Sequence, residues 1–329
     1  MAKDLKIKFT ICLLLLLPIC LWRISYHVSN IWWIENITGI PSAIATVYYS
    51  GFILFLIFRY YLYSFCSLLL AFLCSYQNPA QLYSNIPCPD PLKIVQYNLF
   101  YTNPDLSPFL TYLTENNIDL VILQETSPWH GDRFMEITDN YPYQFGGTPG
   151  LGYPSGQMII SKQPINLRAQ NTPAGHFMIS GVWQSSEKRP ISLYTAHPPS
   201  PRTKQLWYER NALIESLERL ADYSPYSDTL IIGDFNLSSN TKRFVHTFEE
   251  YDTAPVASWP MEITGISIPK TFRIAIDHLW LRNIDTNSLS ICKREVLPQF
   301  SGSDHLAVLT YLSTKKKAFS QRKHNHLTL

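Results

Sequence analysis

The chain has 329 residues, of which 46% are hydrophobic and only 16% are charged. Soluble domains usually carry about 25% charged residues, and the deficit lies at one end, because residues 1–90 hold only eight charged side chains. This apolar content excludes intrinsic disorder, and six cysteines are too few for a scaffold built from disulfides at this length. We therefore expect a membrane region of about 80 residues followed by one large soluble domain.

Three apolar runs occupy the amino-terminal region, at residues 9–22, 40–58 and 62–76. Their lengths are close to the roughly 20 residues that cross a bilayer. No Ala-x-Ala-like cleavage site follows the first run, which therefore resembles an uncleaved anchor rather than a signal peptide. We predict that residues 1–77 form a membrane anchor with about three transmembrane helices. The alternative is a long hydrophobic core helix of a soluble protein.

Basic residues near the predicted spans indicate the orientation of the anchor. Lys3, Lys6 and Lys8 precede the first span, and Arg59 lies between the second and third. Since basic residues favour the cytoplasmic side, the amino terminus is expected there. Three crossings then place the soluble domain outside, which in a bacterium means an inner-membrane protein with a periplasmic domain. If residues 40–76 cross only once, the domain returns to the cytoplasm.

Residues 78–91 contain four prolines and are predicted to be a linker. Four cysteines fall within the spans, which leaves Cys88 and Cys292 in the soluble part. These two could pair in an oxidising compartment, but the sequence alone cannot show that they come within bonding distance. The soluble domain is expected at residues 92–314, followed by a tail at 315–329 with five basic and no acidic residues.

The soluble domain alternates short apolar runs with amphipathic stretches. Strands are predicted at residues 92–97, 118–123, 157–161, 177–183, 191–195, 229–232, 276–281, 289–296 and 306–311. Helices are predicted near residues 106–114, 204–221 and 243–250. Because the strands outnumber the helices and only partly alternate with them, the pattern favours a layered α/β sandwich over a doubly wound sheet.

Polar side chains of catalytic types stand at the ends of these predicted strands. They are Asn98, Glu125, His197, Asp234, Asn236, Asp277, Asp304 and His305. A single Asn or Asp at a strand end is ordinary turn chemistry. Six strand ends with such residues instead indicate a site, because rigid sheets hold functional groups at their edges.

These motifs resemble the endonuclease/exonuclease/phosphatase superfamily. The resemblance rests on segments in family order, including Gln96-Tyr-Asn98, Leu123-Gln-Glu125, Gly233-Asp-Phe-Asn236, Ile276-Asp-His278 and Ser303-Asp-His305. It covers residues 92–312 and, with the amino-terminal spans, looks like the membrane-anchored bacterial branch of the family. It implies a four-layer αββα sandwich of two mixed β-sheets that hydrolyses phosphate esters with a divalent metal.

The resemblance also assigns roles to the strand-end residues. Glu125 offers a hard oxygen ligand to Mg²⁺ or Mn²⁺, with Asn98 and Asp304 completing or supporting that metal site. Asp234 would orient or deprotonate the attacking water, and Asn236 would hold the phosphate or position Asp234. His305, oriented by Asp277, would donate to a phosphoryl oxygen. His197 would be a second phosphate donor.

The sequence leaves the substrate open among a phospholipid head group, a nucleic acid and a small phosphoester. Residues 91–314 carry 17 basic and 22 acidic residues, which counts mildly against duplex DNA, because its binders usually show a basic face. Membrane lipids are expected partners, and no obligate protein partner is evident. An alternative is a tethered binding or sensing domain that keeps the fold without turnover. His130, His176 and His246 have no evident partners in the sequence and are interpreted as surface or loop residues.

Overall fold

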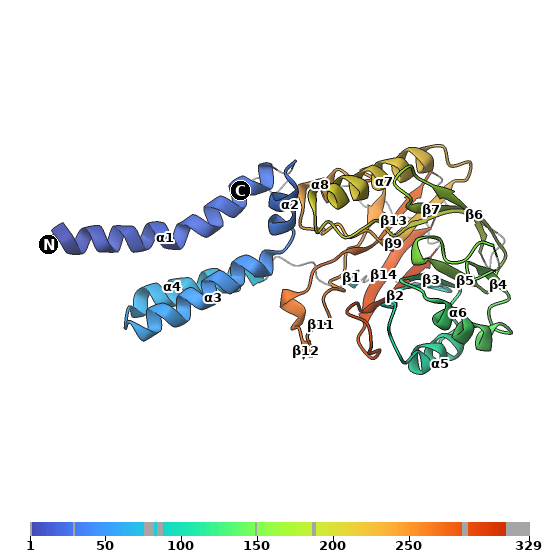
Figure 1. Ribbon diagram of the computed structural model, residues 1–329, viewed down its shortest axis with the longest axis horizontal. Coiled ribbons are helices and arrows are strands. Elements are labelled where there is room, and N and C mark those ends of the chain that lie inside the picture. The colour runs from blue at the N-terminus through green and yellow to red at the C-terminus, as the bar shows by residue number, and fades with distance from the viewer. Residues whose placement is uncertain are drawn as a thin grey trace.

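The structure is a computed structural model that describes residues 2–28, 30–75, 82–83, 88–148, 150–185, 189–284 and 289–313. Figure 1 shows two parts: helices that project to one side and an α/β domain. The helices are α1 (Ala2–His27), α2 (Trp32–Thr38), α3 (Pro41–Ile57) and α4 (Tyr61–Ser75). Helix α2 lies against the domain, whereas α1, α3 and α4 extend away from it.

Of the described helices, α1 alone is long and apolar enough to cross a membrane. Its apolar window is only 11% buried, which disagrees with the alternative of a soluble core helix, because such a helix would be covered by protein. Helices α2 and α3 would count as a second span only if the pair, bent by 67°, is taken as one. Helix α4 has 15 residues, about 22 Å at 1.5 Å per residue.

The projecting helices are joined by hydrogen bonds around the proline of α1. Pro18 lies inside α1, and the Tyr48 hydroxyl of α3 inserts next to it. This hydroxyl accepts from Ile19 N at 3.1 Å and donates to the Leu15 carbonyl at 2.8 Å. The Ser67 hydroxyl of α4 in turn donates to the Tyr48 carbonyl at 2.7 Å. These hydrogen bonds join helices α1, α3 and α4 into one packed unit.

Two mixed sheets form the α/β domain. The first has the order β1 (Leu82–Tyr83), β14 (Ser290–Leu297), β15 (Ala307–Ser313), β2 (Leu92–Asn98), β3 (Leu120–Gln124), β5 (Met158–Ser161), β4 (Tyr143–Phe145). The second has the order β10 (Asp252–Thr253), β13 (Asp277–Asn283), β9 (Asp228–Asp234), β8 (Pro190–Ala196), β7 (Phe177–Gln184), β6 (Ile165–Asn171). Strands β2 and β3 pair in parallel, as do β8 and β9, and the other pairings are antiparallel.

Three apolar layers show why the sheets stack. Ile94 and Ile122 of the first sheet meet Leu193 and Ile232 of the second in a shared core. The other face of the first sheet packs on α5 (Ser107–Glu115) and α6 (Pro128–Phe134). The other face of the second sheet packs on α7 (Lys204–Asp222) and α8 (Lys242–Val245). The predicted four-layer αββα sandwich of two mixed β-sheets is confirmed.

Several predicted elements differ in extent from the observed ones. The helix expected at residues 243–250 ends after one turn, because α8 covers only Lys242–Val245 and is capped at its start by Thr241. Strand β6 was not predicted. It pairs only with β7 and lies at the edge of its sheet, with no fully buried side chain, so its sequence lacks the apolar run of a central strand.

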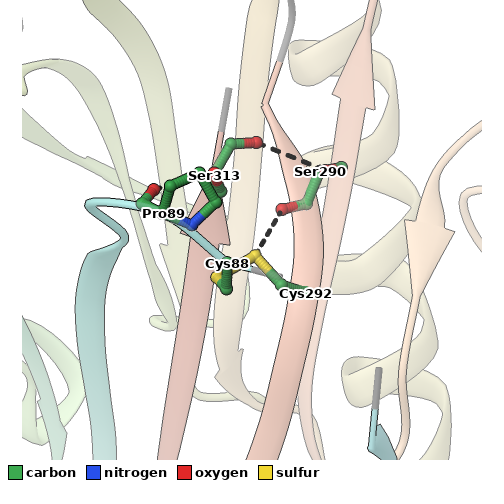
Figure 2. Close-up of a disulfide and its surroundings, with 5 residues drawn as sticks. All are labelled: Cys88, Pro89, Ser290, Cys292 and Ser313. Carbon is green, nitrogen blue, oxygen red and sulfur yellow. Dashed lines mark hydrogen bonds between the residues drawn. A yellow bond between two sulfur atoms is a disulfide. The ribbon is translucent and has the colours of Figure 1, made fainter. Parts of the chain in front are cut away.

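Cys88 and Cys292 form a disulfide, which resolves the alternative left open by the sequence (Figure 2). Their Cα atoms are 5.9 Å apart across 204 residues of sequence. The bond ties the segment before β2 to β14, the second strand from the edge of the first sheet. Beside it, the Ser313 hydroxyl donates to the Pro89 carbonyl at 3.1 Å.

Candidate active site

The strand ends meet at one edge of the sandwich because of the strand directions. The carboxyl ends of β2, β3, β8 and β9 point there, together with the amino ends of the antiparallel strands β13 and β15. Asp277 is directly paired with Asp234 across β13 and β9. A Cβ on Gly233 would lie 2.3 Å from the Ala196 carbonyl oxygen, so β8 and β9 approach this closely only with glycine at that position.

A cleft of about 540 Å³ opens at this edge. Six of the eight predicted site residues line it: Glu125, His197, Asp234, Asn236, Asp304 and His305. The other two, Asn98 and Asp277, lie directly behind and hydrogen-bond to the lining residues. The structure therefore brings all eight predicted residues together.

A buried group of two carboxylates and one imidazole forms the back of the cleft. His305 Nδ1 is 2.9 Å from Asp277 Oδ2, and His305 Nε2 is 3.7 Å from Asp234 Oδ2. Asp277 also accepts from the Ser258 hydroxyl and, at 3.4 Å, from Gln96 Nε2. The imidazole thus lies between two carboxylates, with Asp277 fixing its orientation and its Nε2 directed toward the cleft side.

Burial and charge set the protonation of this group in opposite ways. Burial disfavours the imidazolium of His305, but the carboxylates of Asp277 and Asp234 outweigh it and raise the pKa of His305 to about 10. Burial also opposes ionisation of Asp277, yet His305 and the hydrogen bonds hold the pKa of Asp277 below its usual range. Burial raises the pKa of Asp234, and the attraction of His305 and His197 offsets this only in part. A cationic donor therefore stands beside a carboxylate of raised basicity.

Asn98 connects Asp234 to the more open carboxylate of Glu125. Its Nδ2 donates to Glu125 Oε1 at 3.1 Å and to Asp234 Oδ2 at 3.0 Å. Its Oδ1 accepts from Phe100 N at 3.0 Å, which fixes the orientation of the amide. Glu125 follows β3 in the left-handed region with φ of 51°, a conformation that turns its side chain out of the sheet register.

His197 and Asn236 border Asp234 on the cleft side. His197 Nε2 is 3.6 Å from Asp234 Oδ2 and 3.9 Å from Glu125 Oε1, while its Nδ1 is 3.3 Å from the Ser155 carbonyl. The Asn236 backbone N–H donates to Asp234 Oδ1 at 3.0 Å, and its Nδ2 donates to the Pro198 carbonyl at 3.1 Å. Asp234 therefore accepts hydrogen bonds on both carboxylate oxygens.

Two functional contacts were missed by sequence reasoning. The Trp259 indole Nε1 donates to Asp304 Oδ2 at 2.9 Å, which fixes that carboxylate at the cleft. Arg294 is completely buried and donates to the Asp277 carbonyl at 3.0 Å and to Gln96 Oε1 at 3.1 Å. Burial lowers the pKa of Arg294 to about 10, although Asp277 opposes this. Arg294 lies in a strand with charged neighbours, so nothing in the sequence marks it as buried.

The interpretation of three histidines as surface or loop residues holds for His176, in a loop, and for the exposed His246, but is wrong for His130, and all three have partners. His130 is fully buried and caps α6, with its Nδ1 accepting from Ser127 N at 3.1 Å. His176 pairs with Glu209 at 3.2 Å, and His246 pairs with Glu249 at 2.7 Å. The capping contact spans only three residues, so a Ser-x-x-His start to a helix was the signal available.

The donor set at the cleft fits a hard divalent cation. Glu125 and Asp304 both present carboxylate oxygens to the cleft, the ligands that Mg²⁺ and Mn²⁺ prefer. Asp234, Asp277 and His305 also lie close enough together to hold an ion, with ligand atoms within 4.8 Å of one another. That group is less open to a ligand from the cleft, because the side chains of Asp234 and Asp277 are each 1% exposed and that of His305 is 6% exposed.

Comparison with known proteins agrees with this geometry. The model of the Endonuclease/Exonuclease/phosphatase family matches residues 95–305. The chain belongs to this family. The match spans every strand-end residue from Asn98 to His305, so the sequence resemblance to the family is confirmed. None of the curated proteins matches the chain.

Solved structures of the family share the fold at low identity. D. rerio TDP2, complexed with single strand DNA product, is 16% identical with a TM-score of 0.58, over 68% of this chain and 100% of its own. The endonuclease/exonuclease/phosphatase from Beutenbergia cavernae is 14% identical with a TM-score of 0.52, over 68% and 72%. Beta toxin from Staphylococcus aureus is 16% identical with a TM-score of 0.50, over 67% and 99%. These likenesses show the fold of the domain.

Proposed function

We propose that this protein is a membrane-anchored, divalent-metal-dependent phosphoester hydrolase that uses an activated water. The observation that carries the proposal is the position of Asp234. Its carboxylate is buried, its pKa is raised, and it lies within 3.7 Å of His305 Nε2 and 3.6 Å of His197 Nε2 at the back of a 540 Å³ cleft. A general base with two flanking donors is what hydrolysis of a phosphate ester requires.

The metal would be Mg²⁺ or Mn²⁺, held by Glu125 and Asp304. Asn98 would support the site by fixing Glu125, since its amide donates to that carboxylate. A divalent cation bound there would neutralise charge on the phosphoryl oxygens and stabilise the leaving oxygen. The Trp259 indole keeps Asp304 turned toward the cleft.

The residues of the chain would move the protons and orient the water. Asp234 accepts a proton from the attacking water, and the Asn236 N–H holds its carboxylate in place. His305 donates from Nε2 to a phosphoryl oxygen, with Asp277 holding the imidazolium at Nδ1. His197 would be a second donor when its ring carries both protons, because Nδ1 then donates to the Ser155 carbonyl and Nε2–H is directed at the cleft.

The surroundings of the cleft favour a phosphodiester with one apolar substituent, such as a phospholipid. A second cavity of about 200 Å³ adjoins the cleft, and Ser200, Arg202, Asn236 and Trp259 line both. Its lining also includes Ile40 at the start of the projecting helix hairpin, and Ile274 and Ile276. A phosphate bound beside Asn236 would therefore have an apolar neighbour on the side of the anchor.

The arrangement of the helices supports anchoring with the domain outside the cytoplasm. Figure 1 shows the α3–α4 hairpin returning to the domain, so the turn at Arg59 lies at its far end, on the same side as the amino terminus of α1. Positive charge at both places favours the cytoplasmic side for that end. The Cys88–Cys292 disulfide is typical of an oxidising compartment.

A substrate panel tests the proposal with the full-length protein in detergent micelles containing Mg²⁺ or Mn²⁺. We expect turnover of phosphatidylcholine and of bis(p-nitrophenyl) phosphate, with less turnover of a single-stranded oligonucleotide and of p-nitrophenyl phosphate. Asp139→Asn, on an exposed turn, is the matched control for any substitution at Asp234. Preferred cleavage of the oligonucleotide would contradict the apolar substrate, and no metal-dependent turnover of any ester would favour a binding domain.

A further inference from the structure

The short helix α2 connects the projecting helices to the catalytic domain through a buried carboxylate. Glu35 is only 1% exposed, although it stands in an otherwise apolar region. Its carboxylate accepts hydrogen bonds from Arg210 of α7 and, at 3.0 Å, from Arg243 of α8. The guanidinium of Arg210 is itself 2% exposed. A buried charge pair of this kind forms only where both partners are held in place, because each charge alone would be costly.

Arg210 continues the connection to the active site. While Nη2 faces Glu35, Nη1 donates to the Asn236 carbonyl at 2.9 Å. Asn236 has φ of 49° and directs its own N–H to Asp234 Oδ1 at 3.0 Å. The chain of contacts therefore runs from Glu35 through Arg210 and Asn236 to the proposed general base.

Further contacts fix α2 against the two loops that border the cleft. Asn36 Nδ2 donates to the Pro201 carbonyl at 2.8 Å, in the segment after β8. The Gly39 carbonyl accepts from the Ser238 hydroxyl at 2.6 Å, in the segment after β9. The first segment begins with His197, and Asn236 is the second residue of the other. The amino-terminal region is thus held by three separate contacts at the cleft.

We propose that Glu35 is a positioning residue of the active site, supplied by the membrane-anchor region, which holds Arg210 against the Asn236 carbonyl and so fixes Asp234. The inference rests on the proposed hydrolase function. It implies that the anchor region is part of the catalytic unit. A fragment of residues 90–329 would retain every strand-end residue and still lack the partner of Arg210.

The test compares full-length variants in the same micelles. Glu35→Gln removes the charge at nearly constant shape, and Glu35→Asp keeps the charge on a shorter side chain. Ile37→Ala is the matched control, because Ile37 belongs to the same helix and is 46% exposed. We expect Glu35→Gln to lower kcat by about 10- to 100-fold, the range for residues that orient a catalytic group, with KM changed less than about twofold. Glu35→Asp should retain more of the wild-type kcat, and Ile37→Ala all of it.

A double-mutant cycle separates positioning from general stability. On an Arg210→Gln background, Glu35→Gln should cost little further kcat, because the two residues act through one contact. Equal kcat in Glu35→Gln and wild type, per folded molecule, would overturn the inference. If the wild type hydrolyses no ester, the proposed function fails separately. In that case, thermal unfolding of wild type, Glu35→Gln, Arg210→Gln and the double variant tests the contact between Glu35 and Arg210. Additive shifts in Tm would show that the two side chains do not interact and would overturn the inference.

Discussion

Individual residues of the site differ mainly in how far they are buried. Asp234, Asp277 and His305 are enclosed, whereas the side chains of Glu125 and His197 are 23% and 13% exposed. The buried residues are held by hydrogen bonds before any substrate arrives, which lowers the cost of reorganisation during reaction. The exposed residues are free to meet a metal or a phosphate. In the proposed mechanism, preorganised chemistry and ligand binding are therefore carried by different residues.

The Asp277–His305 pair should behave as one catalytic unit. Asp277→Asn would remove the carboxylate that orients and charges the imidazole, and His305→Gln would remove the donor itself. We expect each substitution to lower kcat by about 10²–10³-fold, and the double variant to be no worse than the more damaging single one. Steady-state kinetics on the best ester measures this. A multiplicative loss in the double variant would show that the two side chains act separately.

His278 should make the fold sensitive to acid. Burial lowers the pKa of His278 to about 3, despite a hydrogen bond to the Leu237 carbonyl that favours the cation. The pKa of His278 in the folded protein lies below the ordinary value of 6.5. The contribution of neutral His278 to folding stability is therefore fully present above pH 6.5 and is lost as the pH falls toward 3.

His278→Gln, which keeps a side-chain donor, should therefore lose less stability than wild type between pH 6.5 and 4. The Tm across this range measures the difference. His246→Gln is the control, because the His246 side chain is 59% exposed. Parallel Tm profiles for His278→Gln and wild type would contradict the assignment.

At the scale of elements, the sequence predicted those parts whose signal is local. Central strands are continuous apolar runs, and polar residues end them, so the edge that carries Asn98, Glu125 and Asp234 could be located in advance. Strand β6 could not be located in this way, because it lies at an edge and its side chains are exposed or only partly buried. Helix α2 also escaped notice, because Trp32-Trp33-Ile34 resembles a membrane-interface belt. Its lone acid, Glu35, was the one signal, but its partners lie 175 and 208 residues away.

The disulfide should stabilise the domain near one side of the first sheet, at strand β14. Cys88→Ser would free the segment before β2 from β14, and we expect a loss of about 2–5 kcal/mol of unfolding free energy. Chemical denaturation of the oxidised protein gives this value. Cys66→Ser, which replaces a free cysteine on α4, is the control and should change the unfolding free energy little. Equal stabilities for Cys88→Ser and wild type would contradict a structural role for the bond.

The whole molecule places the proposed hydrolytic edge beside the ends of its projecting helices. Helix α2 docks on the domain while α1 and the α3–α4 hairpin project away from it, so the cleft would be held near a membrane surface. Reporter fusions after Leu329 test on which side of the membrane the α/β domain lies. Alkaline phosphatase should be active there, and a fluorescent protein that folds only in the cytoplasm should be dark. The reverse pattern would place the domain in the cytoplasm, where the disulfide would not persist.

Metal-dependent turnover is the most direct test of the central claim. The full-length protein, stripped with EDTA, is assayed on bis(p-nitrophenyl) phosphate before and after Mg²⁺ or Mn²⁺ is restored, beside Asp234→Asn and its control Asp139→Asn. The account predicts no turnover without metal, recovery with either ion in wild type and Asp139→Asn, and a loss of about 10²–10⁴-fold in Asp234→Asn. Equal rates for Asp234→Asn and wild type, or turnover that persists in EDTA, would contradict it.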